Sequence, residues 1–288
     1  MTVKVEQIRI SGTGGLTLVA DSAGPVDGQP VILLHGGGQT RHSWGKALDE
    51  FAGAGYRVIS YDARGHGDSD WAAEGDYLLD AMVADLAQVI ATLSRPPVLI
   101  GASMGGASSL LLAGEPGHPA VRALVLVDMA PRMEPAGRAR IREFMSAHLE
   151  HGFGSLEEAA DAVAAYYPER ARPKDISGLM KNLRERGDGR LRWHWDPRFT
   201  RPAQRPEADV FQARLLRAAR GVRVPTLLVR GLKSDMVSQQ SVDELREQIP
   251  GLELAEVGGA GHMVAGDRND AFNRDVFSFL RRHTAAGQ

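Results

Sequence analysis

The stretch Val98-Leu99-Ile100-Gly101-Ala102-Ser103-Met104-Gly105-Gly106-Ala107 joins an apolar run to a Gly-x-Ser-x-Gly motif, and a helix-forming run, Ser108–Ala113, follows directly. The pattern predicts a strand, a tight turn and a helix, the setting in which this motif presents a reactive serine. A Cβ at Gly101 or Gly105 would collide with the adjacent strand or helix, so glycine suits both positions. We therefore expect Ser103 on a strained turn, beside the amides of a helix N-terminus. The alternative is a glycine-rich connection after a parallel strand, and the rest of the chain bears on that choice.

The composition narrows the class of protein. The 288 residues are 43% hydrophobic and 24% charged, as in a globular protein with one large α/β domain, with or without an insertion. A formal net charge of −2 gives no reason to expect nucleic acid or a membrane surface as partner, and no apolar run has the length of a bilayer span. The absence of cysteine excludes disulfides, thiolate metal sites and a cysteine nucleophile. Met1–Ser11 lacks the apolar region of a signal peptide, so we expect a cytoplasmic protein with a small-molecule substrate. Its oligomeric state stays open.

Strand and helix patterns alternate along most of the chain. A hairpin is expected over Val3–Ile10 and Leu16–Asp21, and buried strands over Val31–Leu34, Arg57–Tyr61, Val98–Ala102, Val121–Val127, Pro225–Arg230 and Leu252–Val257. The alternation predicts an α/β fold with a doubly wound, mostly parallel sheet and helices on both faces. Between Met129 and Arg220 only helical patterns such as Arg138–His148 and Leu156–Tyr166 stand out. We therefore expect residues 1–128 and 221–288 to form the core, and residues 129–220 to form an inserted helical cap.

In an open parallel sheet, catalytic and ligand-binding residues lie in the loops after the carboxyl ends of the strands. Ser103, Asp235 and His262 follow three different predicted strands, in the order Ser…Asp…His. A serine nucleophile needs a base to take its proton, and the base needs a carboxylate to hold its tautomer. Asp128 also ends a strand, so two carboxylates compete for the last role, and we favour Asp235.

These motifs resemble the α/β-hydrolase superfamily, in its cap-bearing branch of esterases, carbon–carbon hydrolases and perhydrolases. The resemblance covers nearly the whole core and rests on His35-Gly36-Gly37-Gly38, Asp62-x-Arg64-Gly65-His66-Gly67-x-Ser69, Gly101-Ala102-Ser103-Met104-Gly105-Gly106, Asp235 and Gly261-His262. It implies that Ser103 is the nucleophile, His262 the base and Asp235 the orienting acid, although some members place the acid at the position of Asp128. The backbone amides of Gly37 and Met104 would form the oxyanion hole. The resemblance implies no metal and no organic cofactor, and a serine at this turn argues against the epoxide hydrolases and haloalkane dehalogenases, which use aspartate.

The predicted function is hydrolysis of a small carboxylic ester or lactone through an acyl-enzyme. Carbon–carbon bond hydrolysis of a vinylogous diketone and a non-catalytic small-molecule receptor remain as alternatives. Gly38 and the cap residues Trp193 and His194 are candidates for the substrate pocket, with packing between cap and core as the other interpretation. Arg64, His66 and Asp68 are expected to fix a tight surface turn. The cap carries more basic than acidic residues, which suits either an anionic substrate or a solvated helix face.

Overall fold

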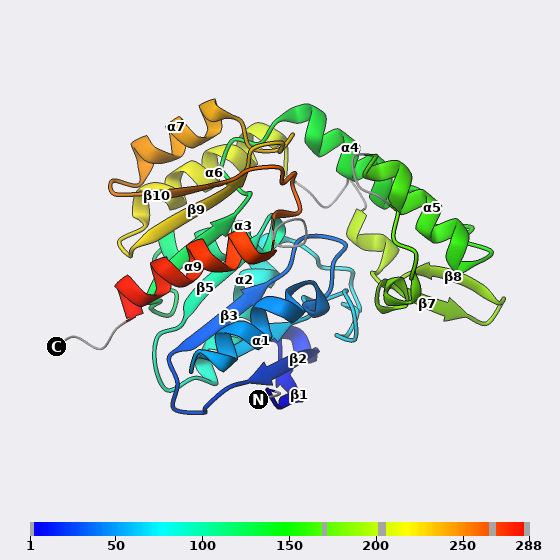
Figure 1. The fold of residues 1–288 in the computed structure, drawn as a ribbon, viewed down its shortest axis with the longest axis horizontal. Helices are drawn as coiled ribbons and strands as arrows, with labels where there is room; N and C mark the ends of the chain where they lie inside the picture. The colour runs from blue at the N-terminus through cyan, green and yellow to red at the C-terminus, as the bar shows by residue number, and fades with distance from the viewer. Residues whose placement is uncertain (1–2, 169–171, 201–205, 265–268, 285–288) are drawn as a thin grey trace.

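The computed structural model describes residues 3–168, 172–200, 206–264 and 269–284, and an eight-stranded sheet forms its centre (Figure 1). The sheet has the order β1-β2-β4-β3-β5-β6-β9-β10. β1 and β2 form an antiparallel hairpin and β2 runs antiparallel to β4, whereas all other neighbours are parallel. The predicted doubly wound, mostly parallel sheet is therefore confirmed. The strands are β1 (Val5–Ser11), β2 (Thr17–Ala23), β3 (Pro30–Leu34), β4 (Arg57–Tyr61), β5 (Val98–Ala102), β6 (Ala123–Val127), β9 (Thr226–Gly231) and β10 (Glu253–Val257).

Helices cover both faces of this sheet. Successive side chains of a strand point to opposite sides, so the apolar strands give the sheet two apolar faces that helices bury. Val31 and Leu33 of β3 pack in a cluster with α1 (Gly45–Gly53) and α9 (Asn269–Thr284). Ile32 and Leu34 of the same strand pack in a second cluster on the other face. The helices of that second face are α2 (Leu79–Ala91), α3 (Met104–Gly114), α6 (Ala208–Gly221) and α7 (Gln239–Gln248).

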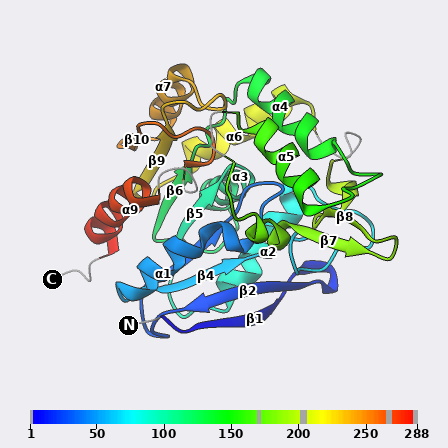
Figure 2. The same ribbon diagram turned by 45° about the vertical axis from the view of Figure 1, so that its right-hand side comes forward.

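The segment between β6 and β9 supplies a group of elements to one side of the sheet, as Figures 1 and 2 show. We call them the cap: α4 (Pro135–Ser146), α5 (Leu156–Tyr166), the strands β7 (Leu183–Arg186) and β8 (Arg190–Trp193), and the 3-10 turns Ser177–Asn182 and Pro197–Thr200. The β7–β8 hairpin was not predicted, because its strands are rich in arginine and lack the apolar run of a buried strand.

Helix α6 was predicted as part of the insertion, but it packs on the core. Leu215, Ala218 and Ala219 lie in the cluster that contains the β6 residues Leu124 and Leu126. The helix approaches α3 so closely that a Cβ on Gly114 would collide with the backbone of Ala218. The division at residues 129 and 220 stays a prediction, and by packing the last residues of that range belong with the sheet.

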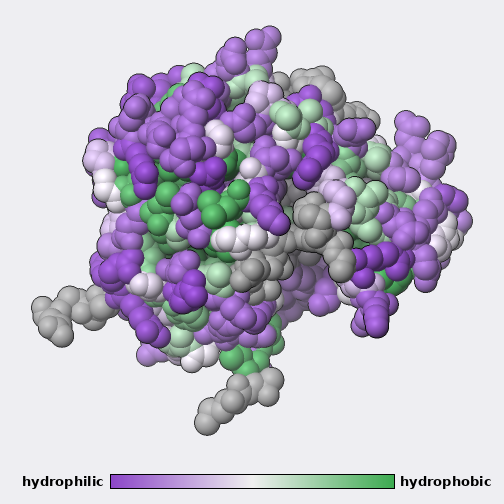
Figure 3. Space-filling model, turned by 45° about the horizontal axis from the view of Figure 1, so that its top comes forward, coloured by the Kyte–Doolittle hydropathy of each residue, from purple (hydrophilic) through white to green (hydrophobic). Residues whose placement is uncertain are grey.

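The surface is mainly hydrophilic on the face drawn in Figure 3, with smaller apolar areas between polar ones. Within the described ranges, the exposed large apolar side chains are scattered over different elements: Val5, Val26, Leu78, Met180, Val210 and Leu232. In the same ranges no helix combines the length and apolar character needed to cross a bilayer, and no cluster of His, Asp and Glu side chains has the arrangement of a metal site.

Candidate active site

Ser103 occupies the sharp turn between β5 and α3. Its backbone has φ 45° and ψ −109°, a left-handed conformation that is strained for a residue with a side chain. The turn is possible because glycine stands on either side of it. A Cβ on Gly101 would collide with the carbonyl oxygen of Gly105, and a Cβ on Gly105 would collide with that of Leu34. The predicted strand–turn–helix is thus present, and Ser103 directly precedes the first turn of a helix.

The loop His35–Gln39 follows β3 and lies against Ser103. A Cβ built on Gly36 would stand 3.5 Å from the Cβ of Ser103, and one built on Gly37 would stand 3.9 Å from the Met104 sulfur. The Gln39 amide N–H donates to the carbonyl oxygen of Gly36 at 3.1 Å, which closes the loop into a tight turn. Met104 is the first residue of α3, so its amide has no acceptor within that helix. The loop that carries one predicted oxyanion donor is therefore adjacent to the helix end that carries the other.

His262 is held by Asp128. The imidazole Nδ1 lies 2.7 Å from Oδ2 of Asp128, whose side chain is fully buried at the end of β6. The same carboxylate accepts hydrogen bonds from the Gly231 amide at 3.2 Å and the Ser234 hydroxyl at 2.5 Å. With Nδ1 donating to the carboxylate, Nε2 is left as the basic nitrogen. Asp128 also has a positive φ, 46°, so the chain bends sharply where its carboxylate leaves the strand.

The assignment of the orienting carboxylate to Asp235 is corrected by this geometry. Ser234, rather than Asp235, faces Asp128, and its oxygen also accepts from the Met236 amide at 3.0 Å, so the loop folds around Ser234. The Asp235 side chain is 36% exposed and forms an ion pair with Arg140 of α4 at 3.3 Å. Asp235 therefore joins the core to the cap, and Asp128, the second candidate from the sequence, takes the position on His262.

Three buried histidines surround the loop that carries Gly37. His35 Nε2 accepts from the Ala63 amide at 2.9 Å, and its Nδ1 lies 2.8 Å from the Gly36 carbonyl oxygen. His66 Nε2 accepts from the Gly38 amide at 3.2 Å, and its Nδ1 lies 3.1 Å from a backbone carbonyl oxygen. Burial lowers the pKa of His35, and burial together with the neighbouring His35 lowers the pKa of His66 to about 3. Both rings are neutral near pH 7, each with one nitrogen accepting and the other donating.

His194 is the third of these histidines and comes from the cap. It is 1% exposed; its Nδ1 accepts from the Gly67 amide at 2.7 Å and its Nε2 lies 3.3 Å from the Gly38 carbonyl oxygen. The predicted pocket residue His194 is thus bonded to two core loops. Trp193, also predicted there, stacks on Trp195 with ring centroids 5.0 Å apart and lies in the apolar interior of the cap.

Apolar cap side chains cover the glycines beside Ser103. A Cβ on Gly38 would stand 3.1 Å from Met145 and 3.4 Å from Trp195. A Cβ on Gly37 would stand 3.5 Å from the Phe199 ring. The predicted pocket position Gly38 therefore has Met145 and Trp195 of the cap against it, and Gly37 has Phe199; Met145 and Phe199 were not foreseen. Aromatic and methionine residues at irregular spacing in a cap give no sequence signal of which ones face the core.

The turn Asp62–Ser69 was expected at the surface but is largely buried. Arg64 is 4% exposed and donates from Nε and Nη2 to the buried carboxylate of Asp85, with distances of 2.7 and 2.8 Å. Asp68 alone of the three predicted turn residues is exposed, and it pairs with Arg184 of the cap at 2.7 Å. The motif therefore joins the loop near the site to α2 and to the cap.

Many of the basic side chains of the cap are engaged in ion pairs. Arg184 and Arg140 pair with core carboxylates, and other pairs join Arg172 to Asp161, Arg192 to Asp188 and Arg198 to Asp196. The two pairs with core carboxylates offset part of the basic excess, and the other pairs engage arginines within the cap, which favours the interpretation of a salt-bridged surface over attraction of an anionic substrate.

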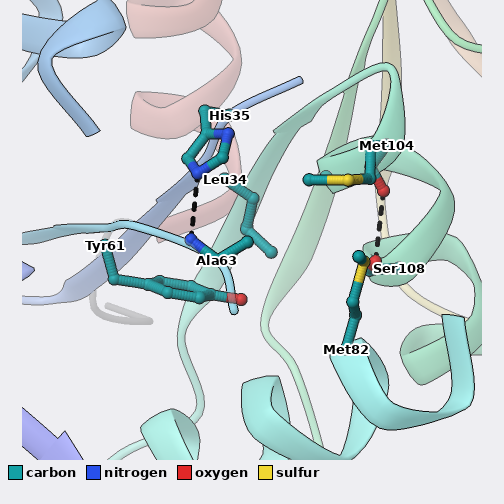
Figure 4. Close-up of a pocket in the computed structure, with 8 residues that line it drawn as sticks. Leu34, His35, Tyr61, Ala63, Met82, Met104 and Ser108 are labelled. Atoms are coloured by element: carbon teal, nitrogen blue, oxygen red, sulfur yellow. Dashed lines mark hydrogen bonds between the residues drawn. The ribbon is translucent and has the colours of Figure 1, made fainter. Parts of the chain in front are cut away.

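A small cavity lies behind the Ser103 turn (Figure 4). Its lining comes from the ends of β3 and β4, from α2 and from the first turns of α3: Leu34, His35, Tyr61, Ala63, Met82, Met104, Gly105 and Ser108. Figure 4 shows the His35 ring bonded to the Ala63 amide at its edge. Neither Ser103 nor His262 lines this cavity.

Comparisons with known proteins agree with the fold. Residues 31–275 match the model of the alpha/beta hydrolase family. The chain is 31% identical to a 3-hydroxybutyrate-oligomer hydrolase of Cupriavidus necator, over 81% of this chain and 83% of that one. It is 30% identical to the esterase Rv0045c of Mycobacterium tuberculosis, over 83% of this chain and 78% of that one. An alpha/beta hydrolase structure from Novosphingobium aromaticivorans superposes with a TM-score of 0.82 at 25% identity, covering 98% of this chain and all of that one.

Proposed function

Because the chain belongs to the alpha/beta hydrolase family, we propose that it is a serine hydrolase that cleaves a small carboxylic ester or lactone with Ser103, His262 and Asp128. The chain is an enzyme of the hydrolase class, as are its named relatives. The observation that carries the proposal is the hydrogen bond from His262 to the buried Asp128, on the strand next to the one that ends in the strained Ser103. A histidine without a catalytic role in a solvated loop would not need a buried carboxylate as hydrogen-bond partner.

The chemistry follows from the position of each group. Ser103 Oγ attacks the ester carbonyl carbon while Nε2 of His262 takes its proton. Asp128 holds the imidazole in the tautomer with Nδ1–H and stabilises the imidazolium that forms. The amides of Gly37 and Met104 donate to the oxyanion of the tetrahedral intermediate. His262 then protonates the leaving alcohol, and a water activated by the same ring hydrolyses the acyl-enzyme.

The surroundings of the loop favour an uncharged acyl group. Met145, Trp195 and Phe199 lie over Gly37 and Gly38, so a chain bound there would meet apolar surfaces. Two relatives at 30% and 31% identity are named as an esterase and as a hydrolase of 3-hydroxybutyrate oligomers, which are themselves esters. The names of these relatives support ester cleavage over cleavage of a carbon–carbon bond.

The test compares two carboxylates in one protein. Hydrolysis of p-nitrophenyl esters from acetyl to octanoyl is measured for the wild type, Ser103→Ala, Asp128→Asn and Asp235→Asn. We expect no turnover from Ser103→Ala, and a loss of about a thousandfold or more in kcat for Asp128→Asn, because the amide stabilises the wrong tautomer. Asp235→Asn removes only a half-exposed ion pair with Arg140 and keeps activity within a few-fold.

Each other outcome has a defined meaning. Loss of activity in Asp235→Asn with retention in Asp128→Asn contradicts the proposed carboxylate. Labelling of Ser103 by a fluorophosphonate without turnover of any ester directs the search to lactones and vinylogous diketones. A wild type that shows neither labelling nor turnover refutes the hydrolase proposal and favours a receptor that retains its ligand.

A further inference from the structure

Three imidazoles form a short column next to the loop that carries Gly37. The ring centroids of His35 and His66 are 5.2 Å apart, and those of His66 and His194 are 5.7 Å apart. The first two rings belong to the core, where they follow β3 and β4, whereas His194 follows β8 of the cap. The column therefore crosses from core to cap beside the proposed oxyanion hole.

The hydrogen bonds of His194 determine its tautomer. Nδ1 accepts from the Gly67 amide at 2.7 Å, so it carries no proton. The ring is neutral because burial, with the neighbouring His66 and His35, lowers the pKa of His194 well below its ordinary value. Nε2 therefore carries the hydrogen and donates it to the Gly38 carbonyl oxygen at 3.3 Å.

Three successive peptide groups, from the one that joins Gly36 to Gly37 to the one that joins Gly38 to Gln39, each have a hydrogen bond to a different histidine. The Gly36 carbonyl, in the same peptide unit as the Gly37 amide, lies 2.8 Å from His35 Nδ1. The Gly38 amide donates to His66 at 3.2 Å, and the Gly38 carbonyl accepts from His194. Gly38 has φ 76°, so its two peptide groups are turned sharply against each other, and the hydrogen bond of each group helps to hold that turn.

The segment around His194 is itself fastened to the core. The Asp196 amide donates to the Gly65 carbonyl at 2.9 Å, and its buried carboxylate accepts from the Tyr77 hydroxyl at 2.5 Å. Arg198 donates to the backbone carbonyls of Ala72 and Ala73, at 2.8 Å in each case. The position of His194 therefore depends on the contacts that hold this part of the cap against the core.

The geometry points to His194 as a positioning residue: its hydrogen bond to the Gly38 carbonyl aligns the Gly37 amide for the oxyanion and makes that alignment depend on the seated cap. This inference rests on the proposed function. His194 touches neither substrate nor reacting atoms, so its effect falls on the transition state, through the loop. Misplacement of a catalytic group by about 1 Å costs on the order of a hundredfold in rate, which sets the scale of the effect.

Two amide substitutions separate the two hydrogen bonds. The side-chain nitrogen of His194→Gln can occupy the place of Nε2 and donate to Gly38, whereas the side-chain oxygen of His194→Asn can occupy the place of Nδ1 and accept from Gly67. Each variant leaves one buried backbone group without its partner, so the two are matched for their cost to folding. The readouts are kcat and KM on p-nitrophenyl esters, the rate of Ser103 labelling by a fluorophosphonate, and Tm.

We expect His194→Gln to keep at least ten times the kcat and the labelling rate of His194→Asn, at similar KM and Tm. Equal losses in the two variants, parallel to a fall in Tm, overturn the inference and leave His194 as a packing residue. A wild type without turnover or labelling refutes the proposed function instead. In that case the amide resonance of Gly37, followed by NMR, still decides: it must shift in His194→Asn and stay near its wild-type position in His194→Gln, and no difference between the variants overturns the inference.

Discussion

Acid should destabilise this protein well above the pH at which its carboxylates protonate, because three buried histidines have to stay neutral. Burial lowers the pKa of His35, His66 and His194, to about 3 for His66. Each ring accepts one backbone N–H through an unprotonated nitrogen, and that bond is lost when the nitrogen takes up a proton. Two carboxylates whose charges act on these rings, Asp62 on His35 and Asp196 on His66, are themselves paired with arginines.

The sign and size follow from proton linkage. In the unfolded chain an ordinary imidazole has a pKa of about 6.5. Below that pH the unfolded state therefore binds more protons than the folded state, in which the rings stay neutral. The free energy of unfolding therefore falls as pH falls, by about 1.4 kcal/mol per pH unit for each ring. Between pH 7 and pH 5 the loss integrates to about 2 kcal/mol for His66, whose pKa is lowered to about 3, and the lowered pKa values of His35 and His194 add to the loss in the same direction. Even the part from His66 is substantial beside the roughly 5–15 kcal/mol that stabilises a folded protein.

Urea unfolding followed by tryptophan fluorescence at several pH values between 7 and 5 measures this loss. His194→Gln removes one titrating ring and keeps a donor for Gly38, so its stability should fall less steeply with falling pH than that of the wild type over this range. His151→Asn, at an exposed histidine, is the matched control and should follow the wild-type slope. The same slope in His194→Gln and in the wild type, or a wild-type stability that is constant from pH 7 to pH 5, would refute the reasoning.

Three further predictions concern the elements that hold the site in place. Gly105→Ala should unfold at lower temperature by calorimetry and lose fluorophosphonate labelling of Ser103, since its Cβ would collide with the Leu34 carbonyl; an active and equally stable variant contradicts this. Asp85→Asn leaves the buried Arg64 guanidinium without its counterion and should cost about 3–5 kcal/mol in urea unfolding, whereas a change below about 1 kcal/mol would argue against a buried pair. Phe199→Ala opens the space over Gly37 and should move the preferred p-nitrophenyl ester to a longer acyl chain; an unchanged chain-length profile places the acyl group elsewhere.

The sheet and the serine turn could be predicted because they depend on local sequence. Apolar runs and the glycines at 101 and 105 have one physical interpretation, a buried strand and a close approach of backbones. The packing of helix α6 on the sheet could not be predicted, because its amphipathic pattern says that it packs, but not on what.

Local sequence could not decide which carboxylate binds His262. Asp128 and Asp235 both follow buried strands, and their sequence surroundings are equally suitable. The choice depends on the positive φ of Asp128 and on Ser234 facing it, both of which are properties of the folded loops. The role of His194 was hidden for a similar reason, since its partners are backbone groups of Gly38 and Gly67, distant in the sequence.

The position of Asp128 bears on how this enzyme could be re-engineered. All three proposed catalytic side chains lie outside the stretch between α4 and the Pro197–Thr200 turn, so a cap from another protein could be grafted there without replacing any of them. Such a chimera would nevertheless lose the donor for the Gly38 carbonyl unless the graft supplied one. Substrate range could then be exchanged together with the cap, but the rate would return only with a histidine or glutamine placed to reach that oxygen.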